Sequence, residues 1–240
     1  MSRLRKFYFA RLAGRVLIAL AVLALYLSQR DMFAVLRGWA FFSGLTPLHA
    51  LWLIWIIDMV GQLVPVQMNI ALGSQKLFRH RFRPIVEAIN YKALKEHILT
   101  TTKAAYKVFL IWVGLLAVLS VLFFTGVLGP DEIFLTTVCF FVCDLVCVLI
   151  WCPFRLIMRN KCCTTCRIFN WDHLMMFSPF ILTPGFYTTS LLIVAFAAWV
   201  LWEVCVMVYP ERFWESTNLA LQCANCTDKL CTQYCQKLRR

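Results

Sequence analysis

Charged residues are scarce in this sequence. They make up 15% of its 240 residues, whereas soluble domains carry roughly a quarter. Hydrophobic residues make up 61% of the chain, and its mean hydropathy is +0.73. This composition excludes an ordinary soluble domain and indicates that lipid covers most of the apolar side chains.

Glycine is also scarce, with nine residues, and no glycine-rich phosphate loop occurs. The sequence has neither a GxSxG nor an HExxH motif, so two common hydrolase signatures are absent. No small-residue cleavage site follows Ala24, so the basic N-terminus and its apolar run predict a retained first span, not a signal peptide. No motif names a substrate or a reaction.

Long apolar runs predict an all-α fold, namely a polytopic transmembrane helical bundle. Residues 30–49 are mixed and predict an interfacial or re-entrant helix. Residues 67–107 form a basic, amphipathic segment, in which a helix starting near Pro84 is expected to lie along the membrane surface. The four spans are expected at residues 12–28, 48–66, 108–128 and 133–152.

The last apolar stretch, residues 174–209, holds about 36 residues. At ~1.5 Å per residue it is too long for one crossing of a ~30 Å hydrocarbon core. Pro179 and the sequence Thr183-Pro184-Gly185 interrupt it. We therefore expect a re-entrant or hairpin C-terminal pair, although a single crossing would place the tail on the other side.

Lysine and arginine counts set the orientation of the spans. The N-terminus carries five, residues 67–107 carry eight and the loop 153–173 carries four, whereas the opposite side holds Arg30 and Arg37. We expect a multi-pass protein of the cell membrane with a cytoplasmic N-terminus. The hairpin would bring 22 of the 24 basic residues to the cytoplasmic side.

The basic residues that give the net charge of +12 lie between apolar runs, so they indicate the membrane topology. We therefore expect no nucleic-acid partner. The expected partners are the lipid bilayer, anionic lipid headgroups and a protein at the cytoplasmic face. Two regions follow: a transmembrane domain, residues 1–209, which includes the segments 67–107 and 153–173, and a Cys-rich tail, residues 210–240.

Seven of the twelve cysteines lie in two polar clusters. The loop reads C-C-x2-C followed by a histidine, and the tail reads C-x2-C-x4-C-x3-C. A two-residue gap lets both sulfurs bind one metal ion. A Cys-rich cytoplasmic face with eight candidate metal ligands is therefore expected: Cys162, Cys163, Cys166, His173, Cys223, Cys226, Cys231 and Cys235.

The identity of the cofactor stays open between zinc and an iron–sulfur cluster, because both accept four thiolates. The tail departs from the bacterial ferredoxin spacing in its middle gap. Disulfides in an external tail, or unligated and palmitoylated thiols, are the alternatives.

Three acidic residues fall inside apolar segments: Asp58, Asp144 and Glu203. A carboxylate at bilayer depth costs several kcal/mol unless it is paired, protonated or hydrated, so each is a functional candidate. Asp58 and Asp144 could instead be protonated packing groups, or pair with Arg155 or another basic residue. Cys139, Cys143 and Cys147 form a stripe beside Asp144, as expected of small packing residues.

Three functions compete. The first is a membrane redox or electron-transfer component. The thiol density supports it, and so does an aromatic-rich bundle that could admit a quinone. The second is a non-catalytic subunit or scaffold with a structural zinc site. The third is a cation or metal transporter using Asp58 and Asp144, although no inverted repeat is visible in the sequence. Whether the chain is an enzyme stays open.

Overall fold

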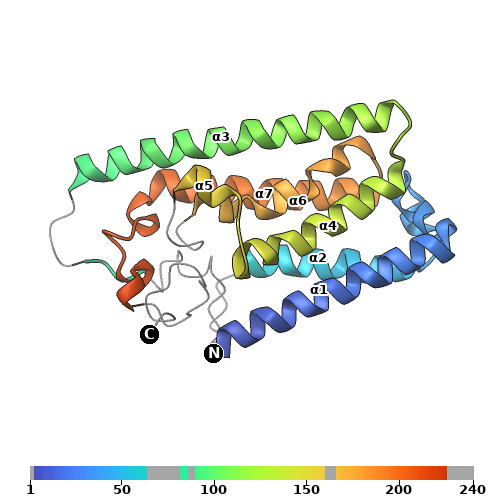
Figure 1. Cartoon of the computed structure of the whole chain (residues 1–240), viewed down its shortest axis with the longest axis horizontal. Helices are drawn as coiled ribbons and strands as arrows, with labels where there is room; N and C mark the ends of the chain where they lie inside the picture. Colours follow the sequence, from blue (N-terminus) through green and yellow to red (C-terminus); the bar gives the residue numbers. More distant parts are fainter. Residues whose placement is uncertain (1–2, 64–81, 86–89, 160–165, 226–240) are drawn as a thin grey trace.

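The computed structural model in Figure 1 describes residues 3–63, 82–85, 90–159 and 166–225 as a set of helices packed side by side. These residues form no β-strand, and the expected all-helical fold is confirmed. The long helices are α1 (Arg3–Ser28), α2 (Pro47–Leu63), α3 (Tyr91–Phe124), α4 (Pro130–Leu149) and α7 (Phe186–Val208). Two short helices, α5 (Phe154–Met158) and α6 (Asp172–Phe177), lie between α4 and α7 along the chain.

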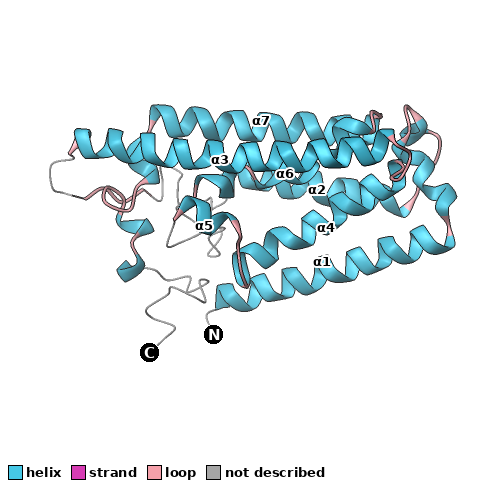
Figure 2. Cartoon of the chain, turned by 45° about the horizontal axis from the view of Figure 1, so that its top comes forward, coloured by secondary structure: helices cyan, strands magenta, loops and turns pink. Residues whose placement is uncertain are grey.

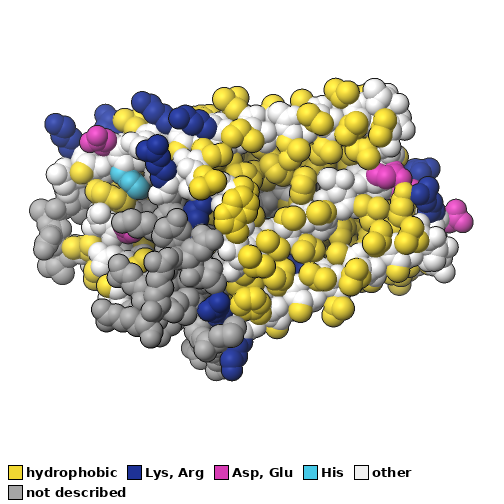
Figure 3. Space-filling view, in the orientation of Figure 1, with side chains coloured by type: hydrophobic (Ala, Val, Ile, Leu, Met, Phe, Trp, Pro, Cys, Tyr) yellow, Lys and Arg dark blue, Asp and Glu magenta, His cyan; other side chains and the backbone are white. Residues whose placement is uncertain are grey.

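Among the described residues, four helices are long and apolar enough to cross a membrane: α1, α3, α4 and α7. The set differs from the four expected spans. Helix α7 is long enough to span a membrane and was not among the four expected spans. Helix α2, which corresponds to the expected span 48–66, has 17 described residues and falls among the shorter apolar helices. Figure 3 shows hydrophobic side chains over the flank of the bundle and Lys and Arg gathered toward its ends.

Helix α3 differs from the expected surface helix followed by a separate span. It begins after Asn90, whose side-chain oxygen accepts a hydrogen bond from Ala93 N at 3.1 Å. It then runs for 34 residues without interruption. No proline lies between Tyr91 and Phe124, so nothing stops the helix where the basic segment meets the apolar run. At ~1.5 Å per residue its length is about 51 Å.

Aromatic side chains fill the centre of the bundle around Trp55 of α2, which is 0% exposed. Its indole ring packs in edge-on and tilted contacts at centroid distances from 5.2 to 6.5 Å, as aromatic pairs prefer. These partners come from α4, α6, α7 and the 3₁₀ turn η7 (Ser178–Leu182): Phe134, Phe141, Phe177, Phe180 and Tyr187.

The segment between α1 and α2 folds as two 3₁₀ turns, η1 (Arg30–Leu36) and η2 (Ala40–Phe42), instead of the expected interfacial helix. Phe33 and Leu36 are buried against the bundle, whereas Trp39 is 76% exposed. Gly38 forms an isolated parallel bridge with Gly185, and Phe186 N donates to Gly38 O at 2.8 Å. The turn before α7 is therefore fixed at the end of the bundle where α1 ends.

Helix α7 returns from this turn beside α6 and α2, as Figure 2 shows. The chain after α7 then contacts the stretch before α3. Leu219 N donates to Arg83 O at 2.9 Å, and Ile85 N donates to Thr217 O at 3.2 Å. The first part of the tail thus lies at the end of the bundle where α3 begins.

Gly185 gives a direct test of this arrangement. A Cβ atom at Gly185 would lie 2.3 Å from Leu36 O and 3.0 Å from Gly38 N. We predict that Gly185→Ala lowers the free energy of unfolding by about 1–3 kcal/mol, because both obstructing atoms are backbone. Thermal unfolding in detergent measures the loss. Gly114→Ala is the control, since a Cβ there meets nothing within 4 Å, and equal melting of the two variants would contradict the contact.

Candidate functional site

A buried guanidinium group joins three helices. Arg15 of α1, whose side chain is 7% exposed, donates from Nη1 to Asp144 Oδ2 of α4 at 2.6 Å and from Nη2 to Asp58 Oδ2 of α2 at 3.1 Å. Nη1 also donates to the backbone oxygen of Phe141 at 2.7 Å, and the guanidinium carbon lies 4.1 Å from the centre of that ring. Two of the three acids that the sequence places within apolar segments, Asp58 and Asp144, are therefore ion-paired with Arg15.

The cluster extends to both sides of Asp58. Arg11 donates from Nη2 to Asp58 Oδ1 at 2.5 Å. His173 of α6 lies with Nε2 3.7 Å from Asp58 Oδ2 and with Nδ1 3.0 Å from Asp172 Oδ1. Gln62 Nε2 donates to Asp172 Oδ2 at 3.4 Å. Residues from α1, α2, α4 and α6 thus meet in one ionic cluster.

Charge balance makes this cluster tolerable away from water. Against burial, which lowers it, the neighbouring Asp172 and Asp58 raise the pKa of His173 to about 10, so this histidine is protonated. With the two arginines it supplies three positive charges, and three aspartates supply three negative charges. Ions removed from water require such pairing with hydrogen bonds. Asp58 and Asp144 were predicted from the sequence, whereas Asp172 was not, and Arg11 and Arg15 were counted only toward topology. Their i, i+4 spacing places both on one face of α1 and was the signal that could have identified them.

Glu203 of α7 forms a second pairing. Its carboxylate accepts hydrogen bonds from Arg167 and from Trp171 Nε1, the latter at 2.7 Å. Arg167 also donates to the hydroxyl group of Thr102 on α3. The side chains of Arg167 and Glu203 are 13% and 15% exposed. This pairing holds the loop that follows Cys166 against α7 and α3.

The expected metal ligands fall mostly outside the described residues, namely Cys162, Cys163, Cys226, Cys231 and Cys235. Of the other three, His173 belongs to the ionic cluster. Within residues 3–63, 82–85, 90–159 and 166–225, no group of three His, Cys, Asp or Glu side chains is arranged to hold a metal ion. The cysteine-ligated zinc or iron–sulfur site stays a prediction.

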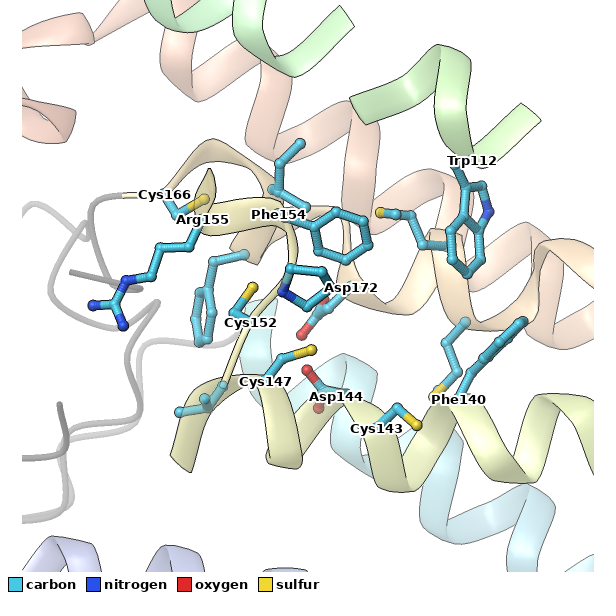
Figure 4. Close-up of a pocket in the computed structure, with 16 residues that line it drawn as sticks. Trp112, Phe140, Cys143, Asp144, Cys147, Cys152, Phe154, Arg155, Cys166 and Asp172 are labelled. Carbon is cyan, nitrogen blue, oxygen red and sulfur yellow. The ribbon is translucent and has the colours of Figure 1, made fainter. Parts of the chain in front are cut away.

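A cavity of about 260 Å³ lies beside the ionic cluster. Figure 4 shows that Cys147 and Cys152 lie near its middle, close to the carboxylates of Asp144 and Asp172. The lining includes four cysteines: Cys143, Cys147, Cys152 and Cys166. The rest of its wall is mainly aromatic and aliphatic, including Trp112, Phe140, Phe154, Phe169, Met175 and Met176. We call it the thiol cavity.

Two of these thiols, those of Cys147 and Cys152, lie close enough to affect each other's ionisation. Helix α4 ends at Leu149, and the chain turns before Pro153 so that the Cys152 thiol forms a hydrogen bond with the Cys147 thiol. This hydrogen bond lowers the pKa of Cys152 to about 6, opposing burial and assisted by the backbone N–H groups of Arg155 and Phe154. Thiolate is the nucleophilic form of cysteine, so Cys152 carries the chemical reactivity of the pair at neutral pH.

A smaller cavity of about 30 Å³ adjoins the other side of the cluster. Arg11, Arg15 and Asp58 line it, and Asp144 and Asp172 line both cavities. A void of this size exceeds the ~10–15 Å³ that one water molecule requires, and polar side chains form part of its wall. The two shared carboxylates therefore connect a hydrophilic void to the cysteine thiols.

Comparisons of sequence and structure find no matching family model, no matching curated protein and no matching solved structure. The arrangement of the site itself offers two chemically distinct features: a charge-balanced ionic cluster and a thiol pair in an apolar cavity. The thiol pair was not predicted from the sequence, because Cys147 was assigned to a helical stripe and Cys152 to the end of the expected span.

Arg15 provides the sharpest test of the cluster. Replacing it with methionine leaves Asp58 and Asp144 without their shared partner. We predict a loss of about 3–5 kcal/mol in stability, as when one member of a buried ion pair is removed. Thermal unfolding in detergent measures it. Arg11→Met is the matched control and should cost less, because the Arg11 side chain is 26% exposed.

A double variant separates charge from packing. Adding Asp144→Asn to Arg15→Met restores the charge balance, because Arg11 and His173 still pair with Asp58 and Asp172, and it should recover most of the lost stability. Wild-type melting of Arg15→Met alone would contradict the structural role of the guanidinium group.

Proposed function

We propose that this chain is a membrane redox protein in which Cys147 and Cys152 interconvert between two thiols and one disulfide. The observation that carries the proposal is their thiol–thiol hydrogen bond at the wall of the thiol cavity. Disulfide formation requires the sulfur atoms to approach to ~2.05 Å, and both thiols lie on the wall of the same cavity, five residues apart at the end of α4.

The chemistry follows from the thiolate of Cys152. A thiolate attacks a disulfide or another electrophilic oxidant, and the neighbouring thiol resolves the product. In the net reaction the two thiols lose two electrons and two protons to a two-electron acceptor of the disulfide or quinone class. Asp144 and Asp172 line the same cavity and give polar surroundings to the protons that are released.

The proposed membrane placement is multi-pass, in the cell membrane, with a cytoplasmic N-terminus and a hairpin between α6 and α7. The basic residue count supports the orientation. The Gly38–Gly185 bridge supports the hairpin, because it holds the turn before α7 at the end of α1.

Adjacent residues of α7 support a shared Cys-rich face. Trp202 packs with Leu221 of the tail, and Glu203 pairs with Arg167 of the loop. We propose that the loop and tail cysteines lie together on the cytoplasmic side and hold zinc or an iron–sulfur cluster, close to anionic lipid headgroups and a protein partner. Either metal group would accept their thiolates.

The transporter alternative is less well supported. A cation pathway through Asp58 and Asp144 requires carboxylates with negative charge to offer, but Arg11 and Arg15 neutralise both. The scaffold alternative assigns no role to the thiol pair. The redox function accounts for both the pair and the adjacent carboxylates.

A redox titration tests the function. Purified protein is equilibrated in glutathione buffers of graded potential, its free thiols are alkylated, and its disulfides are mapped by mass spectrometry. We predict a reversible Cys147–Cys152 disulfide whose oxidised fraction follows a two-electron curve, with a tenfold change in ratio per ~30 mV. Alkylation of Cys152 should rise with pH around its pKa of about 6.

Cys147→Ala and Cys152→Ala should each abolish this disulfide. Cys205→Ala is the matched control, because Cys205 is a partly buried cysteine on α7 that does not line the thiol cavity. Persistence of both free thiols in the most oxidising buffer would rule out the function.

Metal analysis tests the Cys-rich face. Protein purified anaerobically should contain stoichiometric zinc or iron, and Cys163→Ser or Cys226→Ser should lower that content, because each removes one ligand of a CxxC unit. An impermeant thiol reagent should label the metal-stripped tail only from the cytoplasmic side. Metal-free wild-type protein, or labelling of the tail from outside, would refute the shared face.

A further inference from the structure

We infer that the thiol cavity binds a quinone ring, with the hydrophobic tail of the quinone leaving past Trp112, Phe140 and Cys143. This inference rests on the proposed function, since it names the oxidant of the Cys147–Cys152 pair. A quinone is an apolar two-electron acceptor that is soluble in lipid. The cavity offers apolar walls, a thiol pair and carboxylates in one place.

The aromatic end of the cavity is held in place. The Trp112 and Phe140 rings pack at a centroid distance of 5.0 Å with an interplanar angle of 57°. Trp112 Nε1 also donates to Ser178 Oγ at 2.9 Å. The indole ring therefore has its orientation fixed by two contacts. Rigid aromatic walls favour planar and apolar ligands.

The reactive end lies next to these rings. Figure 4 shows Phe154 above Cys152 and Asp172, with Cys147 and Asp144 below them. Phe154, Cys147 and Cys152 all line the cavity, so a ring bound in it would have both aromatic and thiol neighbours. Asp144 and Asp172 add carboxylate groups to the same lining.

Access from the bilayer is available at α4. Cys143 lies on the cavity wall and is also exposed on the surface of the protein, so the cavity is open there. The volume of about 260 Å³ is close to the lower end of the ~300–1,000 Å³ range of small-molecule sites. The cavity is therefore large enough for a ring, while a long tail must extend outside it along the exposed face of α4.

The reaction balances without a further reagent. The Cys152 thiolate and the Cys147 sulfur form one S–S bond as the S–H bond of Cys147 breaks, and two electrons pass to the quinone. The proton of Cys147 and the proton that Cys152 gave up on ionising convert the two carbonyl oxygens into the hydroxyl groups of the quinol. The reverse reaction reduces the disulfide at the expense of quinol. Asp144 and Asp172 connect the cavity to the ionic cluster and the smaller hydrophilic void, so protons have polar partners on leaving or entering.

Anaerobic reduction of decylubiquinone by the full chain in nanodiscs tests the inference. Reduced protein is mixed with the quinone, quinol formation is followed by absorbance, and the disulfide is mapped afterwards. We expect one equivalent of quinol per Cys147–Cys152 disulfide, and none from Cys147→Ala or Cys152→Ala.

Two matched variants test the route of the tail. Cys143→Phe places a ring at the opening, whereas Cys139→Phe places the same ring one turn earlier on α4, where the cysteine is exposed and does not line the cavity. Quinol formation should slow by about tenfold or more in Cys143→Phe, because the reactants no longer align. It should stay near the wild-type rate in Cys139→Phe.

Oxidation by glutathione disulfide separates the two proposals. If glutathione disulfide oxidises the pair but decylubiquinone does not, the quinone site is refuted and the redox function stands. If neither reagent oxidises the pair, the redox function fails and the inference fails with it. Equal quinol formation in Cys143→Phe and Cys139→Phe would overturn the route through the cavity opening.

Discussion

The guanidinium group of Arg15 is the interaction on which the rest of the structure depends. It holds Asp58 of α2 and Asp144 of α4 against α1, and Asp58 in turn contacts His173 of α6. Separating any of these helices would leave a buried charge without a partner, and in an apolar surrounding that penalty is larger than in water. The position of α4, and hence of the thiol cavity, is fixed by this ionic contact as well as by aromatic packing.

The end of α4 brings two cysteine side chains close together. Pro153 cannot continue the hydrogen-bonding pattern of the helix. The chain turns before it, which brings Cys152 close to Cys147. The thiols then share a wall with Asp144, which belongs to the ionic cluster. The redox chemistry that we propose would therefore take place on the helix that also carries part of the ionic cluster, since Asp144 lines the cavity and pairs with Arg15.

Hydropathy was enough to predict the helical fold, and the cost of buried charge was enough to identify Asp58, Asp144 and Glu203. Their partners could not be predicted, because Arg15 and Arg167 reach across segments far apart in the sequence. The register of Cys147 and Cys152 was missed for a local reason: α4 ends at Leu149, before the expected end of the span. His173 was assigned to a metal by its spacing from Cys166, whereas packing places it between two carboxylates.

The neighbouring contacts of Trp202 and Glu203 give α7 a mechanical consequence. Successive residues on an α-helix point about 100° apart, so the tail at Leu221 and the loop at Arg167 hold different sides of the same helical turn. Twisting of α7 about its axis would strain both attachments at once. The last turns of α7 therefore connect the tail to the loop mechanically. If a bound partner displaced the tail, the resulting rotation of α7 would also pull on the loop that borders the cavity.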